Sequence, residues 1–168
     1  MKKPDLRELT EMSVLAALTF AGKVAMASLP NIEPVSLMIM LMTVIYGRKA
    51  LYPIYVYVML EMLVYGFNLW NLVYLYIWLF LAVPAYFMRP VRQRLPWAIL
   101  SGAFGLLFGL LCIPVYAAVG GWHMVFSTWI SGIPYDLVHG VSNFLIALVA
   151  FVPLRDLLEK LSARRIRP

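Results

Sequence analysis

Apolar stretches follow one another along almost the whole chain, and charged residues stand in short groups between them. Of 168 residues, 63% are hydrophobic and 13% are charged, against roughly 45–50% and 25% in an average soluble domain. A soluble globule of this size could not bury so many apolar side chains. Cys112 is the single cysteine, so disulfides cannot hold the chain together either. The sequence excludes an ordinary soluble enzyme, a disordered chain and a secreted disulfide scaffold. It predicts a membrane protein.

We expect an all-helical protein with six transmembrane helices, because a spanning helix needs about 20 mostly apolar residues. Six helices use most of the chain and make residues 1–168 a single integral membrane domain. The second span is too short, at ~1.5 Å per residue, to cross a ~30 Å hydrocarbon core. Either it is tucked among the other helices, or Ser28–Pro34 enters the protein as a re-entrant cap. The predicted spans are Thr10–Ala27, Val35–Tyr46, Ala50–Tyr65, Leu72–Met88, Pro96–Val119 and Phe126–Val152.

The basic residues predict the orientation of these helices. All 14 lysines and arginines except Lys23 flank alternate connections or the chain ends. The connections Ser28–Pro34, Gly66–Asn71 and Gly120–Val125 contain none. The positive-inside rule then places both termini in the cytoplasm, in a prokaryotic plasma membrane. Because these cations form short groups and no continuous patch, they disfavour nucleic-acid binding. They are Lys2, Lys3, Arg7, Arg48, Lys49, Arg89, Arg92, Arg94, Arg155, Lys160, Arg164, Arg165 and Arg167.

Small side chains recur every four residues in the first span, at Ser13, Ala17, Ala21 and Ala25. Such a stripe lets two membrane helices approach closely. Lys23 lies ~200° around the helix from Ala21 and should point into a polar interior. The stripe has two interpretations that the residues alone leave open, which are packing within this bundle and contact with another protein. For the similar stripe at Ser101, Gly105 and Gly109 in the fifth span we favour internal packing.

The few polar side chains near the spans concentrate on the side without cations. Asp136, His139 and Asn143 share one face of the sixth helix, and Glu61 shares a face with tyrosines in the third. The cation-free connections and their flanks add amide, carboxylate and aromatic groups. The residues that we expect to bind a solute are Asn31, Glu33, Tyr65, Asn68, Trp70, Asn71, Trp122, Tyr135, Asp136 and His139.

Three explanations compete for this polar set. The first is structural, with an interfacial aromatic belt and an ion pair between Lys23 and either Glu61 or Asp136. The second is a proton relay, a role that carboxylates and histidine often have inside membranes. The third is a solute pocket open to the outside, with aromatic walls and a few converging polar groups. The amide and aromatic side chains favour the third explanation.

No catalytic signature is present, so we expect no enzyme activity, cofactor or metal in this chain. Zinc-protease and nucleophile-elbow motifs are missing, and Ala21-Gly22-Lys23-Val24 is no phosphate-binding loop. The pair Asp136 and His139 supplies at most two metal ligands from one helix. If this protein transports a solute against its concentration gradient with energy from a nucleotide, another chain must hydrolyse that nucleotide.

The chain resembles the substrate-binding (S) components of energy-coupling factor (ECF) transporters over nearly its whole length. The resemblance rests on Val14–Pro34, which carries the alanine spacing and the Leu-Pro-Asn-Ile-Glu-Pro connection. It continues through Tyr65–Trp70 and through the Gly-Ile-Pro-Tyr-Asp-Leu-Val-His-Gly stretch of residues 132–140.

The resemblance implies a high-affinity receptor for a vitamin or related micronutrient that docks onto a transmembrane coupling subunit with two ATP-binding subunits. Ala17, Ala21 and Ala25 would form the docking face, and the first outer connection would place Asn31 and Glu33 near the substrate. Cobalamin-type S components are the most similar subgroup, while riboflavin, niacin and pyridoxine-type ligands stay open. The alternative function is a stand-alone proton- or ion-coupled carrier that uses Lys23, Glu61, Asp136 and His139. A non-transporting scaffold is a third possibility.

Overall fold

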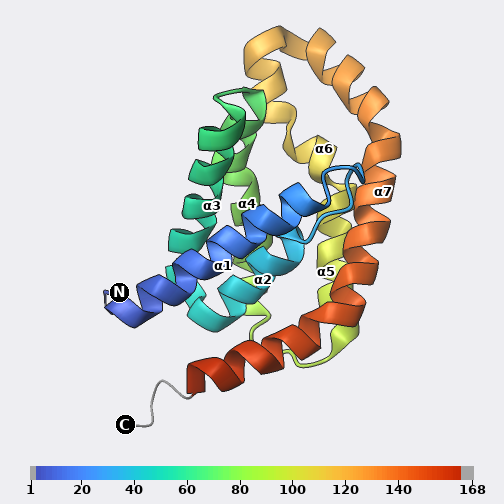
Figure 1. The fold of residues 1–168 in the computed structure, drawn as a ribbon. Coiled ribbons are helices and arrows are strands. Elements are labelled where there is room, and N and C mark those ends of the chain that lie inside the picture. The colour runs from blue at the N-terminus through green and yellow to red at the C-terminus, as the bar shows by residue number, and fades with distance from the viewer. Residues whose placement is uncertain (1–2, 164–168) are drawn as a thin grey trace.

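Residues 3–163 are described by the computed structural model, and all regular elements in this range are helical (Figure 1). The all-helical prediction is therefore confirmed for this part of the chain. The predicted cytoplasmic cations Lys2, Arg164, Arg165 and Arg167 lie outside the described residues. The elements are α1 (Leu6–Ala25), α2 (Val35–Tyr46), the 3₁₀ helix η1 (Gly47–Ala50), α3 (Leu51–Tyr65), α4 (Leu69–Phe87), α5 (Arg94–Leu106), α6 (Phe108–Leu111) and α7 (Ile113–Ala163).

The last predicted spans differ most from the observed helices. The stretch predicted as one fifth span is divided among α5, α6 and the beginning of α7. α7 itself consists of two helices that meet at Gly121, where φ is 64° and ψ is −170°. A positive φ of this kind suits glycine, which has no Cβ to clash. The second of these helices extends beyond the predicted end at Val152 as far as Ala163, because a stretch of leucines interspersed with charged residues continues it.

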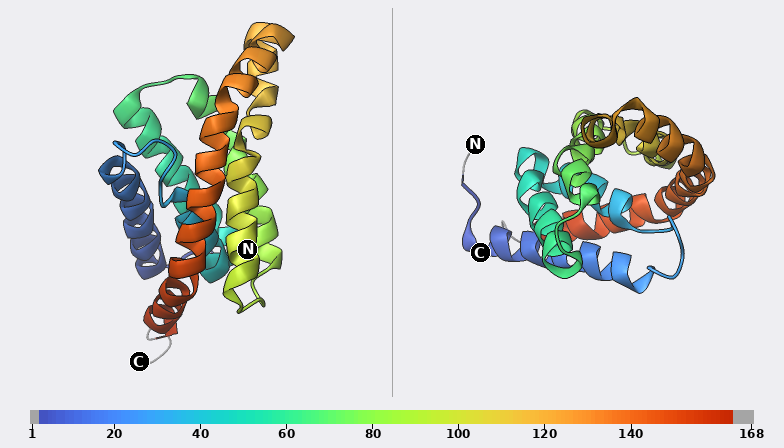
Figure 2. Two further views of the ribbon diagram at one scale, coloured as in Figure 1. Left: turned by 90° about the vertical axis from the view of Figure 1, so that its right-hand side faces the viewer. Right: turned by 90° about the horizontal axis from the view of Figure 1, so that it is seen from above.

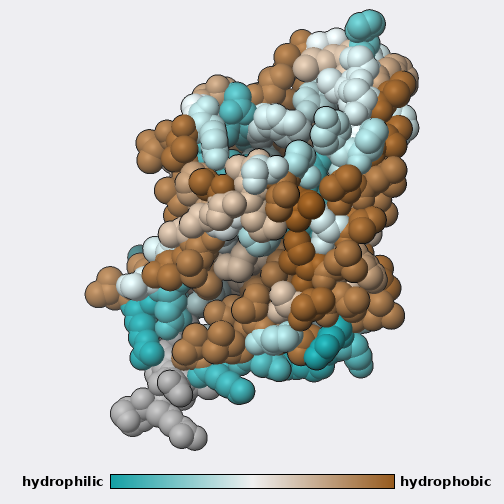
Figure 3. Space-filling view, turned by 45° about the vertical axis from the view of Figure 1, so that its right-hand side comes forward, coloured by the Kyte–Doolittle hydropathy of each residue, from teal (hydrophilic) through white to brown (hydrophobic). Residues whose placement is uncertain are grey.

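Among residues 3–163, three stretches are long and apolar enough to cross a membrane by length and composition: Val35–Tyr65, Leu69–Phe87 and Ile113–Ser162. The first of these contains the turn η1 between α2 and α3. Large apolar side chains also cover much of the outer surface, as Figure 3 shows for one face. These features are compatible with membrane insertion. Six spans and the orientation of the termini stay predictions.

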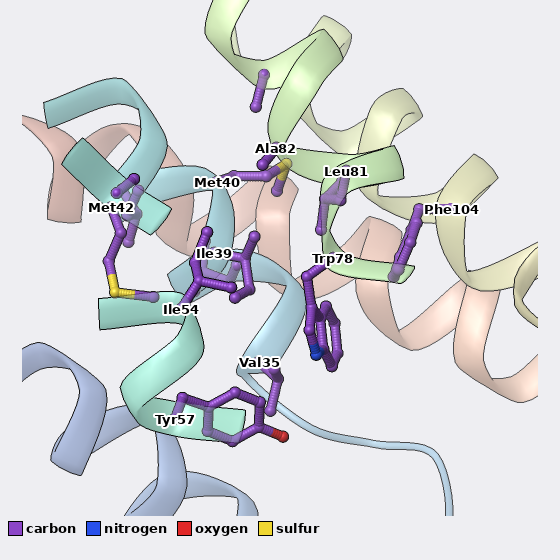
Figure 4. Close-up of a cluster of buried hydrophobic side chains, with 14 of the residues drawn as sticks. Val35, Ile39, Met40, Met42, Ile54, Tyr57, Trp78, Leu81, Ala82 and Phe104 are labelled. Atoms are coloured by element: carbon purple, nitrogen blue, oxygen red, sulfur yellow. The ribbon is translucent and has the colours of Figure 1, made fainter. Parts of the chain in front are cut away.

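The core forms around α2, which contacts α1, α3, α4 and α7. Ile39, Met40 and Met42 of this helix are fully buried, and they pack against Ile54 of α3 and Leu81 of α4 (Figure 4). This central position explains how so short an apolar helix is accommodated, because protein surrounds it on most sides. The connection after α1 also packs against the protein, beside α6 and α7 (Figure 1). The short second span is therefore tucked among the other helices, and a re-entrant position of Ser28–Pro34 in the membrane stays a prediction.

α5 and α7 lie side by side along much of their length (Figure 2, left). Their backbones approach closely at Gly105, where an added Cβ would lie 2.7 Å from the carbonyl oxygen of His139 and 2.8 Å from the amide nitrogen of Gly140. Ser101 is buried in the same interface. The predicted internal packing of the small residues in this region is confirmed.

The basic connections meet at the lower end of the molecule in Figure 1, where the C-terminal part of α7 also lies. Arg155 is buried, and its guanidinium donates to the carbonyl oxygens of Val91 and Arg89 at 2.6 and 2.7 Å. Glu159 pairs with Arg155 and with Arg92 of the connection between α4 and α5. Elsewhere at this end Lys49 of η1 pairs with Glu8 of α1 at 2.6 Å.

Candidate functional site

A cavity of about 730 Å³ lies between α1, α3, α4, α6, α7 and the connection that follows α1. Its lining includes Asn68 of the α3–α4 connection, and this connection is in the upper part of the view in Figure 1, away from the basic end. Hydrophilic and weakly polar residues gather in the upper part of Figure 3 between apolar flanks. The volume is within the range of ~300–1,000 Å³ that is typical of small-molecule sites.

The connection between α1 and α2 forms one wall of the cavity and is attached to α7 through Asn31. The side-chain amide of Asn31 donates to the carbonyl oxygen of Tyr135 at 3.0 Å. Ser142 returns a hydrogen bond of 2.9 Å from its hydroxyl to the carbonyl oxygen of Asn31. Asn31 has a φ of 58°, a conformation that asparagine tolerates better than most residues. These contacts keep the neighbouring Glu33 in the cavity wall.

Lys23 of α1 points into the cavity and pairs with Glu61 of α3. The Nζ–Oε2 distance is 2.5 Å, and Nζ also lies 3.3 Å from the hydroxyl of Tyr74. The side chain of Glu61 is only 5% exposed, and its second oxygen, Oε1, has no hydrogen-bond partner. The sequence left Glu61 and Asp136 as alternative partners of Lys23, and the structure selects Glu61.

Asp136 and His139 of α7 contribute polar groups to the other wall of the cavity. Both carboxylate oxygens of Asp136 accept from the backbone amide of Gly109 at 3.2 Å. This amide is available because the helix is interrupted at Leu107, before α6. His139 is buried, and its Nε2 lies 4.0 Å from Oε1 of Glu33, too far for a hydrogen bond. Burial raises the pKa of Glu33, while the nearby charge of Lys23 acts in the opposite direction.

The beginning of α4 supplies the upper edge of the cavity. Asn68 and Asn71 form a reciprocal capping box, in which the amide of Asn68 donates to Oδ1 of Asn71 at 2.7 Å and the amide of Trp70 donates to Oδ1 of Asn68 at 2.9 Å. Both side-chain oxygens are thus engaged in capping the helix. The indole of Trp70 contacts the rings of Phe108 and Tyr116, which links α4 to α6 and α7.

All the predicted binding residues except Trp122 line the cavity. Trp122 is 66% exposed, contacts Phe126 and follows the bend at Gly121, which carries it away from the site. A bend at a single glycine has no periodic signal in the sequence, so the sequence could not separate this position from the residues that line the cavity. The predicted residues that line the cavity are Asn31, Glu33, Tyr65, Asn68, Trp70, Asn71, Tyr135, Asp136 and His139.

Some lining residues were not among the predicted binding residues. Trp129 could have been found, because it precedes Asp136 by two helical turns on the same face of α7. Phe108 and Tyr116 had no comparable signal, since the predicted continuous span hides the interruption that brings them to the cavity.

The alanine stripe of α1 faces outward. Ser13, Ala17, Ala21 and Ala25 are all exposed, whereas Lys23 on the other side of the helix lines the cavity. The stripe therefore does not pack against the described residues of this chain, and its contact with another protein stays a prediction.

The chain matches no family model, no curated protein and no solved structure. Within residues 3–163 there is no group of three or more histidine, cysteine, aspartate or glutamate side chains that could hold a metal ion. The geometry therefore has to be interpreted from its own chemistry. It combines an aromatic and acidic cavity with an exposed stripe of small residues on one helix.

Proposed function

We propose that this protein is the substrate-binding membrane subunit of an ECF-type, ATP-dependent transporter that takes up a vitamin or related micronutrient. The observation that carries the proposal is the two-sided character of α1. One side of this helix sends Lys23 into the cavity, and the other side exposes Ala17, Ala21 and Ala25. A receptor that transfers its ligand to another subunit needs one side of the helix for the ligand and one for that subunit. A carrier that acts alone does not need the exposed alanine side.

The cavity supports the capture of a small molecule. Its walls contain the rings of Tyr65, Trp70 and Trp129 together with polar side chains from α3 and α7. Aromatic rings offer large, rigid contact area at low entropic cost. A corrinoid stays among the candidate ligands, together with riboflavin, niacin and pyridoxine-type compounds.

The proposal includes six membrane spans with both termini in the cytoplasm. The basic connections and the C-terminal part of α7 gather at one end of the molecule, and the cavity lies toward the other. The positive-inside rule would place the basic end in the cytoplasm and open the cavity to the outside. Nucleotide hydrolysis would then belong to two ATP-binding subunits below a transmembrane coupling subunit.

The docking role of α1 is tested by Ala21→Trp. We expect this variant to lose association with the coupling subunit and its ATP-binding subunits while keeping the ligand affinity of the original protein, because the added indole projects from the face opposite the cavity. Co-purification and ligand binding are measured on the same preparations. Val149→Trp, at a 70% exposed position of α7, is the matched control for adding a bulky side chain to the surface.

Uptake assays separate the proposal from its main alternative. We expect uptake to depend on ATP hydrolysis by the partner subunits and to continue after collapse of the proton gradient. Gradient-driven uptake by the isolated protein in vesicles would contradict the proposal and favour the carrier. Equal loss of ligand binding and association in Ala21→Trp would also contradict it.

A further inference from the structure

The charges that line the cavity do not balance. Among the described residues, the charged side chains of the lining are Lys23, Glu33, Glu61 and Asp136. Lys23 is paired with Glu61, so these two charges largely cancel. Glu33 and Asp136 have no lysine or arginine within ion-pair distance in the described part of the chain. The cavity thus carries an excess of two carboxylates, and a bound cation would offset the cost of their burial.

Two residues of the lining carry buried polar atoms without a partner. Oε1 of Glu61 and Nε2 of His139 have no hydrogen-bond partner, and both residues are only 4% exposed. Buried polar atoms of folded proteins nearly always have a partner, so the protein alone does not satisfy the polar groups of this site. An ionised carboxylate only accepts hydrogen bonds. The acceptors in the lining therefore require N–H or O–H donors on the ligand.

Aromatic rings complete the chemistry of the lining. Tyr65 and Tyr74 already attract a cation, since Nζ of Lys23 lies 5.7 and 5.1 Å from their ring centroids. Trp70, Trp129 and Tyr135 add further aromatic surface around the same cavity. A positive charge is attracted to the face of an aromatic ring, most strongly where water is excluded. A flat ligand would also stack on these faces.

We propose that the cavity binds a small organic cation built on a flat aromatic ring system, held by Glu33 and Asp136 and surrounded by the aromatic walls. This inference rests on the proposed function and narrows its substrate class. The volume of about 730 Å³ suits a ligand with one to three rings. A neutral or anionic nutrient leaves the two carboxylates uncompensated.

The test compares ligands of the same shape and different charge on the purified full-length protein. The probes are 4-aminoquinoline, which is a cation with N–H donors at pH 7.5, neutral quinoline and quinoline-4-carboxylate, each measured by isothermal titration calorimetry at that pH. We expect the cation to bind at least tenfold more tightly than quinoline and the carboxylate to show no binding. Equal affinity for the cation and quinoline, tighter binding of the carboxylate, or no binding of the cation would each overturn the assignment.

Charge-neutralising variants locate the effect. Glu33→Gln and Asp136→Asn should each weaken binding of the cation at least tenfold and lower the affinity for quinoline by a much smaller factor. Glu159→Gln is the matched control, because its carboxylate pairs with Arg92 and Arg155 at the other end of the molecule. Gel filtration and tryptophan fluorescence establish that each variant is folded. Unchanged cation affinity in both cavity variants would contradict the assignment.

The outcome is separable from that of the proposed function. If the quinoline series shows no preference for positive charge while Ala21→Trp still abolishes association, the substrate class is wrong and the docking role stands. If the charge preference holds and no coupling subunit binds the original protein, the cavity assignment stands and the transporter assignment is wrong. Cyanocobalamin is included in the titrations, and its binding in place of the cation would also refute the substrate class.

Discussion

The ion pair between Lys23 and Glu61 connects α1 to the cavity. Lys23 approaches Glu61 and Tyr74 from α1, while the second oxygen of Glu61 is buried without a hydrogen-bond partner. A lysine in a predominantly apolar helix is costly unless it reaches a polar partner. This requirement fixes the rotation of α1 about its axis. It thereby also determines that the alanine stripe faces outward.

Removal of one member of this pair should destabilise the fold. Lys23→Met leaves the buried carboxylate of Glu61 without its cation, and we expect a loss of about 3–5 kcal/mol in the free energy of unfolding. The double variant Lys23→Met/Glu61→Met should lose less, because no unpaired charge remains. Unfolding in mixed micelles, followed by tryptophan fluorescence, measures both. A double variant as unstable as the single one would argue against this explanation.

Glu33 should make stability depend on pH. Burial is the main cause of its raised pKa, so the folded protein favours the protonated carboxyl relative to the unfolded chain. The stabilisation is present below the ordinary value of 4.5 and is lost as the pH rises from there through the raised pKa. We expect the unfolding midpoint of Glu33→Gln to vary less with pH in this range than that of the original protein. The same pH dependence in both proteins would assign the effect to other groups.

At the scale of elements, the contact of α5 with α7 organises both the core and the site. The rings of Trp97 and Phe151 stack with their centroids 4.2 Å apart. Farther along the same two helices, Gly105 lies close to the backbone of His139 and Gly140. Close backbone approach at a glycine is a common way for membrane helices to pack. Beyond this contact the helix is interrupted at Leu107. The backbone amide of Gly109 is therefore free to donate a hydrogen bond to Asp136.

Gly105→Ala should therefore be destabilising although alanine is the better helix former. The new methyl group would lie closer to the backbone of α7 than real Cβ atoms come to their neighbours, so we expect a loss of about 1–3 kcal/mol. Gly132→Ala is the matched control, because no atom lies within 4 Å of its added Cβ. Thermal unfolding of the two variants in detergent compares them. Equal midpoints would show that α5 and α7 can separate without cost.

At the scale of the whole molecule, the two ends have different chemistry. Ion pairs and arginine–carbonyl hydrogen bonds connect the helices at the basic end. The other end contains the acidic, aromatic cavity. This asymmetry leads to the orientation in the proposed function.

Labelling of introduced cysteines tests that orientation. In a Cys112→Ala background, Phe67→Cys in the α3–α4 connection should react with a membrane-impermeant maleimide on intact cells. Gln93→Cys in the α4–α5 connection should react only after the cells are permeabilised. Both wild-type positions are exposed, so access depends on the membrane and not on burial. Labelling of both positions from outside would contradict the proposed topology.

Local sequence patterns predicted the helical class, the ends of α2 and nine of the residues that line the cavity. These properties follow from the local distribution of apolar and polar side chains, which is already present in the unfolded chain. The outward direction of the alanine stripe was left open, because it depends on the partner that Lys23 finds on α3.

The packing of the helices determines which distant groups meet. The interruption at Leu107, the bend at Gly121 and the bond from Asn31 to the carbonyl of Tyr135 join segments far apart in the chain. They determine that Phe108 and Tyr116 reach the cavity while Trp122 does not. The physical reason is that helix packing selects these local backbone departures, and periodicity along the sequence does not encode the packing.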